Sequence, residues 1–270
     1  MKLTLRHTLT FSLGAPAHAA QHVLLTALST PQQKVERWSI EMPGFAEAVT
    51  FRDAFGNRAH LVTQTRDDAD VVVVVTGTVE TFDRAGVLGR LEFDPMPALF
   101  RRQMADAPAD PVLTEGLSLD GGRIALLHEL MDRVHGTTGA PEQMEAQGSQ
   151  SQSQGGQSQS QSQSQGASPA VAKPATDLAR AFIGAARSLE IPARYVTGYL
   201  FDEGTGSFHA WAEAWDEGLG WIGFDPALNV CPADAHIRLA SGLDLMSTMP
   251  IRSVPVWSEM PVETIELVAD

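Results

Sequence analysis

The chain has 270 residues, of which 43% are hydrophobic and 19% charged, and its formal net charge is -14. These values are typical of a soluble globular protein of one or two domains with a full core. The acidic balance argues against nucleic acid or an anionic membrane as a partner, because both select clustered Lys and Arg.

The sequence contains no run of about 18 apolar residues, so it predicts no transmembrane helix. The single cysteine, Cys231, excludes a disulfide framework and a thiolate metal cluster. We therefore expect a cytoplasmic protein, and we predict no cofactor and no metal.

The first residues resemble a signal peptide only superficially. The segment Ala17-His18-Ala19-Ala20 mimics a signal-peptidase site. The stretch before it, however, alternates apolar and polar residues from Leu3 to Leu13, whereas a signal sequence has a continuous apolar region. The alternation favours a half-buried β-strand.

Residues 1–96 predict an antiparallel β-sandwich. Short apolar stretches recur at regular spacing with turn residues between them, which is typical of such folds. The turn at 53–57, Asp-Ala-Phe-Gly-Asn, places Gly and Asn where a positive φ is needed. The predicted strands after the first cover 21–28, 34–41, 45–51, 58–65, 71–75 and 77–82.

The remaining chain predicts helices packed on an antiparallel sheet. Residues 124–134 and 178–189 each carry an apolar stripe at helical spacing. Strand patterns cover 194–200, 208–215 and 221–224, and the last two predict a hairpin across 216–220. Two further strand patterns, 251–256 and 262–268, lie within a mixed tail from 233 onward. The predicted fold class is therefore α+β, with a core domain formed by residues 97–146 and 171–270.

The segment 147–170 consists almost entirely of Gln, Ser and Gly. Such a segment has too little apolar surface to offset its ordering entropy, so we expect disorder. A flexible loop is favoured over a Gln/Ser interaction tract.

Four motifs follow one another in the second half of the chain: Ala185-Ala186-Arg187-Ser188-Leu189, Ile191-Pro192-Ala193-Arg194-Tyr195-Val196-x-Gly198-Tyr199, His209-Ala210-Trp211-Ala212-Glu213 and Gly220-Trp221-x-Gly223-Phe224-Asp225-Pro226. In this order and spacing they resemble the bacterial transglutaminase-like family, which groups with cysteine proteases of the papain-like superfamily. The residues 5–7 and 53–57 also resemble the N-terminal region of that family.

The resemblance implies a Cys–His–Asp triad in which His209 and Asp225 are two members. Ungapped counting places the family's cysteine on Ala175, the first candidate catalytic position, and its following aspartate on Asp177. A methyl group cannot attack a carbonyl, and loss of a nucleophile lowers activity by several orders of magnitude.

Other residues are poor substitutes for the missing thiol. Thr176 lies about 100° around the helix from position 175. Cys231 follows the last motif and is better interpreted as a partly buried cysteine. His209 and Asp225 remain open to two interpretations, a buried pair that orients the hairpin or part of a ligand-binding site. Arg194 is expected to pair with Glu213 or Asp177.

The sequence therefore predicts a catalytically silent transglutaminase-like scaffold or regulator that binds a peptide or protein. The insertion at 147–170 fits a cleft that no longer performs chemistry. The alternative is an active peptidase, amidase or acyl-transferase with a non-standard nucleophile. A third interpretation, that Ala175 is an introduced substitution, is disfavoured because neighbouring Lys173 and Thr176 also depart from the family pattern. The sequence predicts no oligomeric state.

Overall fold

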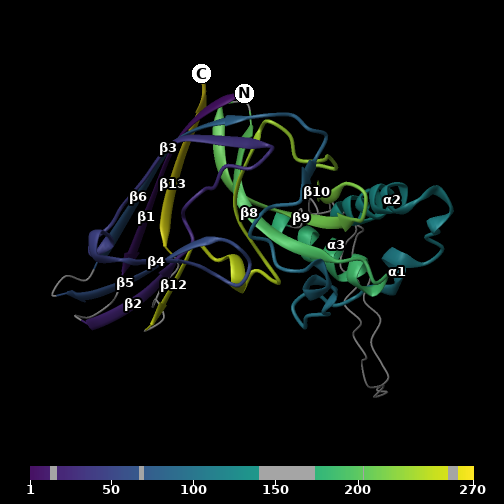
Figure 1. Ribbon diagram of the computed structural model, residues 1–270, viewed down its shortest axis with the longest axis horizontal. Coiled ribbons are helices and arrows are strands. Elements are labelled where there is room, and N and C mark those ends of the chain that lie inside the picture. Colours follow the sequence, from purple (N-terminus) through teal and green to yellow (C-terminus); the bar gives the residue numbers. More distant parts are fainter. Residues whose placement is uncertain (13–16, 67–69, 140–173, 203, 255–260) are drawn as a thin grey trace, which may run out of the picture.

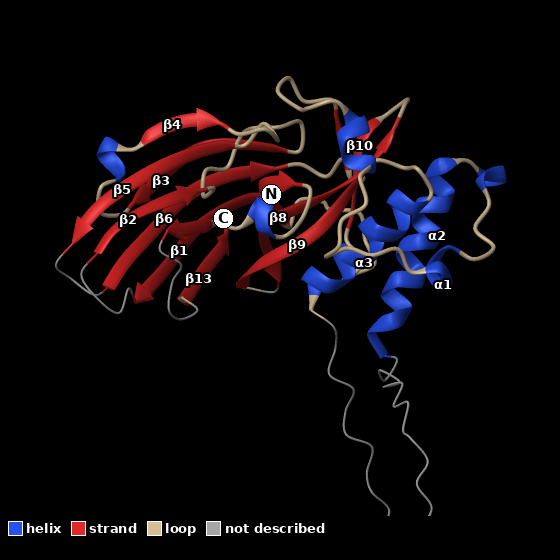
Figure 2. Cartoon of the chain, turned by 90° about the horizontal axis from the view of Figure 1, so that it is seen from below, coloured by secondary structure: helices blue, strands red, loops and turns tan. Residues whose placement is uncertain are grey.

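The computed structural model describes residues 1–12, 17–66, 70–139, 174–202, 204–254 and 261–270 (Figures 1 and 2). The predicted Gln/Ser insertion at 147–170 lies outside these residues. No helix in the described ranges is long and apolar enough to cross a membrane.

Two four-stranded antiparallel sheets form the N-terminal part of the molecule, at the left of Figure 1. Buried side chains from both sheets form a common core between them, as predicted for a sandwich. One sheet has the order β13-β1-β6-β3, with strands Val262–Ala269, Lys2–Ser12, Asp70–Thr81 and Gln33–Glu41. The other has the order β12-β2-β5-β4, with strands Ile251–Val254, Ala17–Val23, Arg58–Arg66 and Val49–Arg52.

The alternation at the N-terminus does form a strand. Along β1 the odd-numbered residues Leu3, Leu5, Leu9 and Phe11 are buried, together with His7. The residues that mimic a cleavage site lie in β2, which pairs with β5. The predicted strand is therefore confirmed, because one face of β1 lies against the core of the sandwich.

The third sheet carries the motifs. Its order is β11-β8-β9-β10-β7, and its neighbouring strands are antiparallel. The predicted hairpin consists of β9 and β10, which are joined by residues 217–219. Gly220, the first residue of β10, has a φ of 83°, which favours glycine. The five strands are His236–Gly242, Ala193–Asp202, Thr205–Asp216, Gly220–Phe224 and Val87–Gly89.

Three α-helices lie together at one side of the third sheet (Figure 2). The apolar stripe of α3 packs against β9, where Ala210, Ala212 and Ala214 allow a close approach because their side chains are small. The helices are α1 Pro111–Thr114, α2 Arg123–Gly136 and α3 Ala175–Ser188. Short 3₁₀ turns cover Phe45–Glu47, Pro97–Arg101, Leu119–Gly121, Thr137–Gly139 and Met246–Thr248.

The strand pairing differs from the domain division expected from sequence. Strand β7 comes from the segment 1–96 but pairs with β10 of the core sheet. Strands β12 and β13 come from the segment 171–270 but pair with β2 and β1 of the sandwich. The chain therefore returns to its N-terminal sheets at its end, so the sandwich is completed by residues far away in sequence.

Buried hydrogen bonds join the sandwich region to the core sheet. The Gln33 side chain donates to the carbonyl of Arg238 at 2.8 Å and accepts from its N–H at 2.7 Å. Asn57 makes the same two-way contact with the backbone of Ser241, at 2.8 and 2.9 Å. His7 Nδ1 lies 3.0 Å from the Tyr199 hydroxyl on β8. These contacts fix the third sheet against the first two.

Burial of His7 should make the fold sensitive to acid. Burial lowers the pKa of His7 from 6.5 to about 4. The unfolded chain therefore takes up this proton at a higher pH than the folded chain does. The contribution of His7 to the free energy of unfolding is therefore intact above pH 6.5. It is lost as the pH falls toward 4, by up to about 3 kcal/mol.

Urea unfolding at pH 7 and at pH 4.5 measures this loss. The variant His7→Asn, whose amide can still reach the Tyr199 hydroxyl, should show a smaller loss between the two pH values than the wild type. The exposed His128 on α2 gives a matched control, His128→Asn, which should follow the wild type. Equal losses in His7→Asn and wild type would contradict the assignment.

Candidate functional site

The structure brings His209 and Asp225 together. His209 lies in β9, and Asp225 directly follows β10, the partner strand in the hairpin. His209 Nε2 donates to Asp225 Oδ2 at 2.6 Å, and both residues are buried. The second carboxylate oxygen, Oδ1, accepts the backbone N–H groups of Ala227 at 3.0 Å and Leu228 at 3.3 Å. The turn after β10 therefore fixes the orientation of the carboxylate.

Asp225 is held as a carboxylate. Burial disfavours its charged form, but hydrogen bonds from His209 and His236 outweigh burial and lower the pKa of Asp225 to about 2. Asp225 is therefore ionised at neutral pH and can only accept hydrogen bonds. The Nε2 atom of His209 must then carry a hydrogen, and in the neutral ring this leaves the Nδ1 atom as an acceptor.

His209 presents its second nitrogen outside this pair. Nδ1 has no hydrogen-bond partner in the described part of the chain, and the residue keeps 8% of its surface exposed. The ring stacks beside Trp211, with centroids 6.3 Å apart and planes at 27°. A neutral imidazole in this state can act as a general base or accept a hydrogen bond from a ligand.

The motif-based analysis missed His236. It is the first residue of β11, and its Nε2 lies 3.1 Å from the same Asp225 oxygen that His209 contacts. The sequence gives only a weak signal for it, because His236 belongs to none of the four motifs and stands in the segment interpreted as a mixed tail. The ligand atoms of His209, Asp225 and His236 all lie within 4.8 Å of one another, so in the described part of the chain these three residues form a group that could hold a metal ion.

A buried ionic network occupies the same face of the sheet as His209. Residues alternate along β9, so Glu213 shares a face with His209, while Ala210 and Ala212 face α3. The Glu213 carboxylate accepts from Arg194 Nε at 2.6 Å and Arg238 Nε at 2.7 Å. Although burial opposes ionisation, the two arginines lower the pKa of Glu213. The predicted pairing of Arg194 with Glu213 is thus confirmed.

Asp177, the other partner considered for Arg194, pairs with Arg180 instead, at 3.2 Å. Arg194 also contacts Asp94, with Nη1 2.9 Å from Oδ1, and its guanidinium lies 3.9 Å from the Trp221 ring centroid. A planar guanidinium can satisfy carboxylates at its edge and an aromatic ring at its face. The network therefore holds the connection between β7 and the helices against the sheet.

The packing around Gly198 explains why the second motif has a glycine at this position. It pairs with His209 across β8 and β9 and with Arg238 across β8 and β11. A β-carbon at this position would overlap the carbonyl oxygen of Ile237 and the Trp211 ring. Only glycine lets the Trp211 ring lie across β8 next to the imidazoles.

Ala175 is the first residue of α3 and is partly buried. Pro174 precedes it as the N-cap residue and donates no N–H, which costs nothing at a helix start. The position where the resemblance puts a cysteine thus lies at a helix N-terminus, where a thiolate is stabilised by the helix dipole. The methyl group of Ala175 carries no charge, so the helix dipole does not stabilise it.

Cys231 lies on the loop from Asp225 to His236. Its side chain is partly buried, as expected, and burial raises the pKa of the thiol. An activated cysteine requires the opposite shift. The observed environment therefore disfavours Cys231 as a replacement nucleophile.

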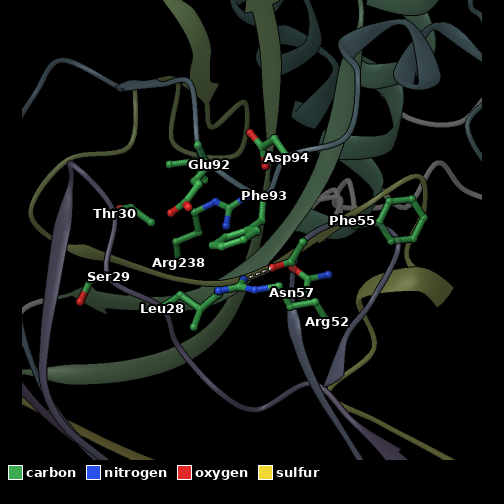
Figure 3. A pocket seen from close by; sticks show the side chains of 12 residues that line it. Leu28, Ser29, Thr30, Arg52, Phe55, Asn57, Glu92, Phe93, Asp94 and Arg238 are labelled. Carbon is green, nitrogen blue, oxygen red and sulfur yellow. Dashed lines mark hydrogen bonds between the residues drawn. The ribbon is translucent and has the colours of Figure 1, made fainter. Parts of the chain in front are cut away.

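A cavity of about 290 Å³ lies where loops of the sandwich region meet the core (Figure 3). Its described lining includes Arg52, Phe93, Asp94 and Arg238, and Arg52 lies over the Phe93 ring at 3.7 Å. His209 and Asp225 do not line it. The cavity is linked to the ionic network through Arg238, whose guanidinium contacts Glu213, and through Asp94, which pairs with Arg194.

Two family models match separate parts of the chain. The bacterial transglutaminase-like N-terminal region matches residues 3–80, and the transglutaminase-like superfamily core matches residues 153–226. The second range includes Ala175, His209 and Asp225. The predicted resemblance is thus confirmed for the N-terminal region and for the core.

One solved structure supports the same fold. The crystal structure of a "putative cysteine protease" from Cytophaga hutchinsonii aligns with a TM-score of 0.68 at 20% identity, over 99% of this chain and 90% of that one. The periplasmic domain of TgpA from Pseudomonas aeruginosa, at 16% identity over 84% of this chain and 88% of its own, reaches only 0.34. "Uncharacterized protein ML0607" of Mycobacterium leprae (strain TN) is 33% identical over 76 residues. That match spans 25% of this chain and about a quarter (26%) of the relative. The protein therefore has a transglutaminase-like, cysteine-protease-like fold.

The ionic network should be essential for stability. Replacing Glu213 by Gln leaves Arg194 and Arg238 buried without their shared carboxylate, which costs about 3 to 5 kcal/mol in similar cases. Urea unfolding at pH 7 measures the loss. Glu217→Gln, in the exposed turn between β9 and β10, is the matched control and should change stability by no more than about 0.5 kcal/mol. Equal stabilities of the two variants would show that the network contributes little.

Proposed function

We propose that this protein is a transglutaminase-like protein that has lost its nucleophile and binds a peptide or protein without turning it over. The observation that carries the proposal is a buried, hydrogen-bonded His209–Asp225 pair in a chain whose matching helix begins with Ala175. In this interpretation Ala175 stands where the cysteine of an active relative would be. The protein would act as a scaffold or a regulator.

The chain topology supports a position for Ala175 near the pair. A short connection joins α3 to β8, and β8 is antiparallel to β9, so α3 and β9 run in the same direction. The strand start Ala193 pairs with Ala214, at the level of the helix C-terminus. The helix of 14 residues extends about 21 Å back from there, and His209 lies about 17 Å back along β9. The helix N-terminus and His209 are therefore near the same level.

A peptide fits the chemistry that the site presents. The exposed edge of His209 offers an Nδ1 lone pair, which accepts a hydrogen bond from an amide N–H or a hydroxyl group. The first N–H groups of a helix have no partner within the helix, so the N-terminus at Ala175 suits a carbonyl oxygen or a carboxylate. Together these groups match the donor and acceptor of a peptide unit without supplying a nucleophile.

The second candidate is an active hydrolase that uses water. The observation in its favour is that Asp225 is held as a carboxylate and orients the His209 ring through a hydrogen bond, as the partner of a general base does. A water molecule held by His209 would replace the thiol as nucleophile. This candidate predicts turnover that depends on His209 and does not depend on Cys231.

Restoring the thiol tests the position of Ala175. In a Cys231→Ser background, Ala175→Cys should react with iodoacetamide at pH 7 about tenfold faster than an ordinary thiol, because the helix end and His209 favour the thiolate. Adding His209→Phe should remove the acceleration. The Cys231 thiol of the unmodified protein is the internal reference. An introduced cysteine with ordinary reactivity would show that the helix end and the pair do not cooperate.

Turnover assays separate the two candidate functions. The wild-type protein, incubated with a panel of peptide, amide and ester substrates, should release product at the rate of the buffer blank. His209→Ala should give the same blank rate. A wild-type activity that disappears in His209→Ala and persists in Cys231→Ser would overturn the silent interpretation and support the water-using hydrolase.

A further inference from the structure

Asp225 is shared by two imidazoles. Its Oδ2 atom accepts from His209 Nε2 at 2.6 Å and lies 3.1 Å from His236 Nε2. With Oδ1 occupied by two backbone N–H groups, the carboxylate has four described contacts. All of its acceptor positions are therefore in use. A triad-like site needs only one of these two histidines, so the second requires an explanation.

The backbone fixes the hydrogen of His236 independently of Asp225. The N–H of Ala233 points to His236 Nδ1 at 3.4 Å, and the N–H of His236 donates to the Ala233 carbonyl at 3.1 Å. An Nδ1 atom that accepts cannot carry a hydrogen in the neutral ring. The hydrogen then resides on Nε2, where it points to Asp225.

The rings of His209, Trp211 and His236 pack on one another. The His236 ring meets the Trp211 ring edge-on, with centroids 5.4 Å apart and planes at 81°. Trp211 in turn stacks on His209. His236 thus contacts both the carboxylate that orients His209 and the indole that supports its ring, although it comes from a different strand.

We propose that His236 is a positioning residue that holds His209 in its Nε2–H form, by fixing the Asp225 oxygen that both rings share. Its donated hydrogen bond limits how strongly that oxygen can attract the His209 hydrogen. The Nδ1 atom of His209 then remains the acceptor presented to a ligand. This inference concerns the resting state of the pair, so it holds whether or not the ligand is a peptide.

The same three residues have the composition of a two-histidine, one-carboxylate metal site. A metal would require unprotonated Nε2 atoms on both rings. For His236 this moves the hydrogen to Nδ1, directly facing the N–H of Ala233. The separation of 2.6 Å between His209 Nε2 and Asp225 Oδ2 is also a charge-assisted hydrogen bond. The geometry therefore favours two donors on one carboxylate over three metal ligands.

Nitrogen-15 spectra of the full-length protein, labelled at histidine, test the proposal at pH 7. Both His209 and His236 should show hydrogen on Nε2. In His236→Phe the ring shape is kept and the donor is lost, so the His209 Nε2 hydrogen should move downfield toward a stronger hydrogen bond with Asp225. In His236→Gln the side-chain amide nitrogen supplies a donor at about the reach of the histidine Nε2 atom. The His209 Nε2 hydrogen signal should therefore stay near its wild-type position.

Three results would overturn the proposal. The first is a His236 that carries its hydrogen on Nδ1 in the wild type, a measurement that needs no variant and decides the matter if His236→Phe does not fold. The second is an unchanged His209 signal in a folded His236→Phe protein. The third is stoichiometric loss of both Nε2 hydrogens on adding one equivalent of Zn²⁺, which would make the cluster a metal site.

Discussion

Glu213 is a buried carboxylate, and a buried charge is tolerated only when opposite charges and hydrogen bonds surround it. Its two partners come from other strands of the same sheet, Arg194 from β8 and Arg238 from β11. In that sheet β8 lies between β9 and β11. The pairing therefore requires three strands to keep one register. The same register places His209, Gly198 and Arg238 in one row across the sheet. The candidate site depends on this network for its position.

The sandwich region also holds the sheet that carries the candidate site in place. Hydrogen bonds from Gln33 and Asn57 reach the backbone of β11, and His7 reaches Tyr199 on β8. These contacts pack the two N-terminal sheets against the sheet that carries the motifs. The final strands β12 and β13 then close the sandwich from the other end of the chain. Core and N-terminal region consequently form one connected structure in the described residues.

A retained His–Asp pair does not by itself indicate catalysis. Asp225 is fully buried, and removing His209 or His236 would leave its charge with fewer donors. Stability alone therefore gives the fold a reason to keep both histidines. Under the proposed function, activity would in addition require a nucleophile at the helix N-terminus, where this chain has Ala175. The hydrogen-bonded pair and a nucleophile are therefore separate requirements.

The sequence by itself determined the features that depend on local pattern. Alternation predicted β1, the apolar stripe predicted α3, and the strand patterns at 208–215 and 221–224 predicted the hairpin. The motifs singled out His209 and Asp225. The absence of a thiol at position 175 is also a property of the sequence alone. The tertiary structure decided which distant segments meet: β12 and β13 with the sandwich, Glu213 over Asp177 for Arg194, and His236 beside Asp225. Periodicity reports only which face of an element is buried, whereas these contacts depend on strand order and register across the whole fold.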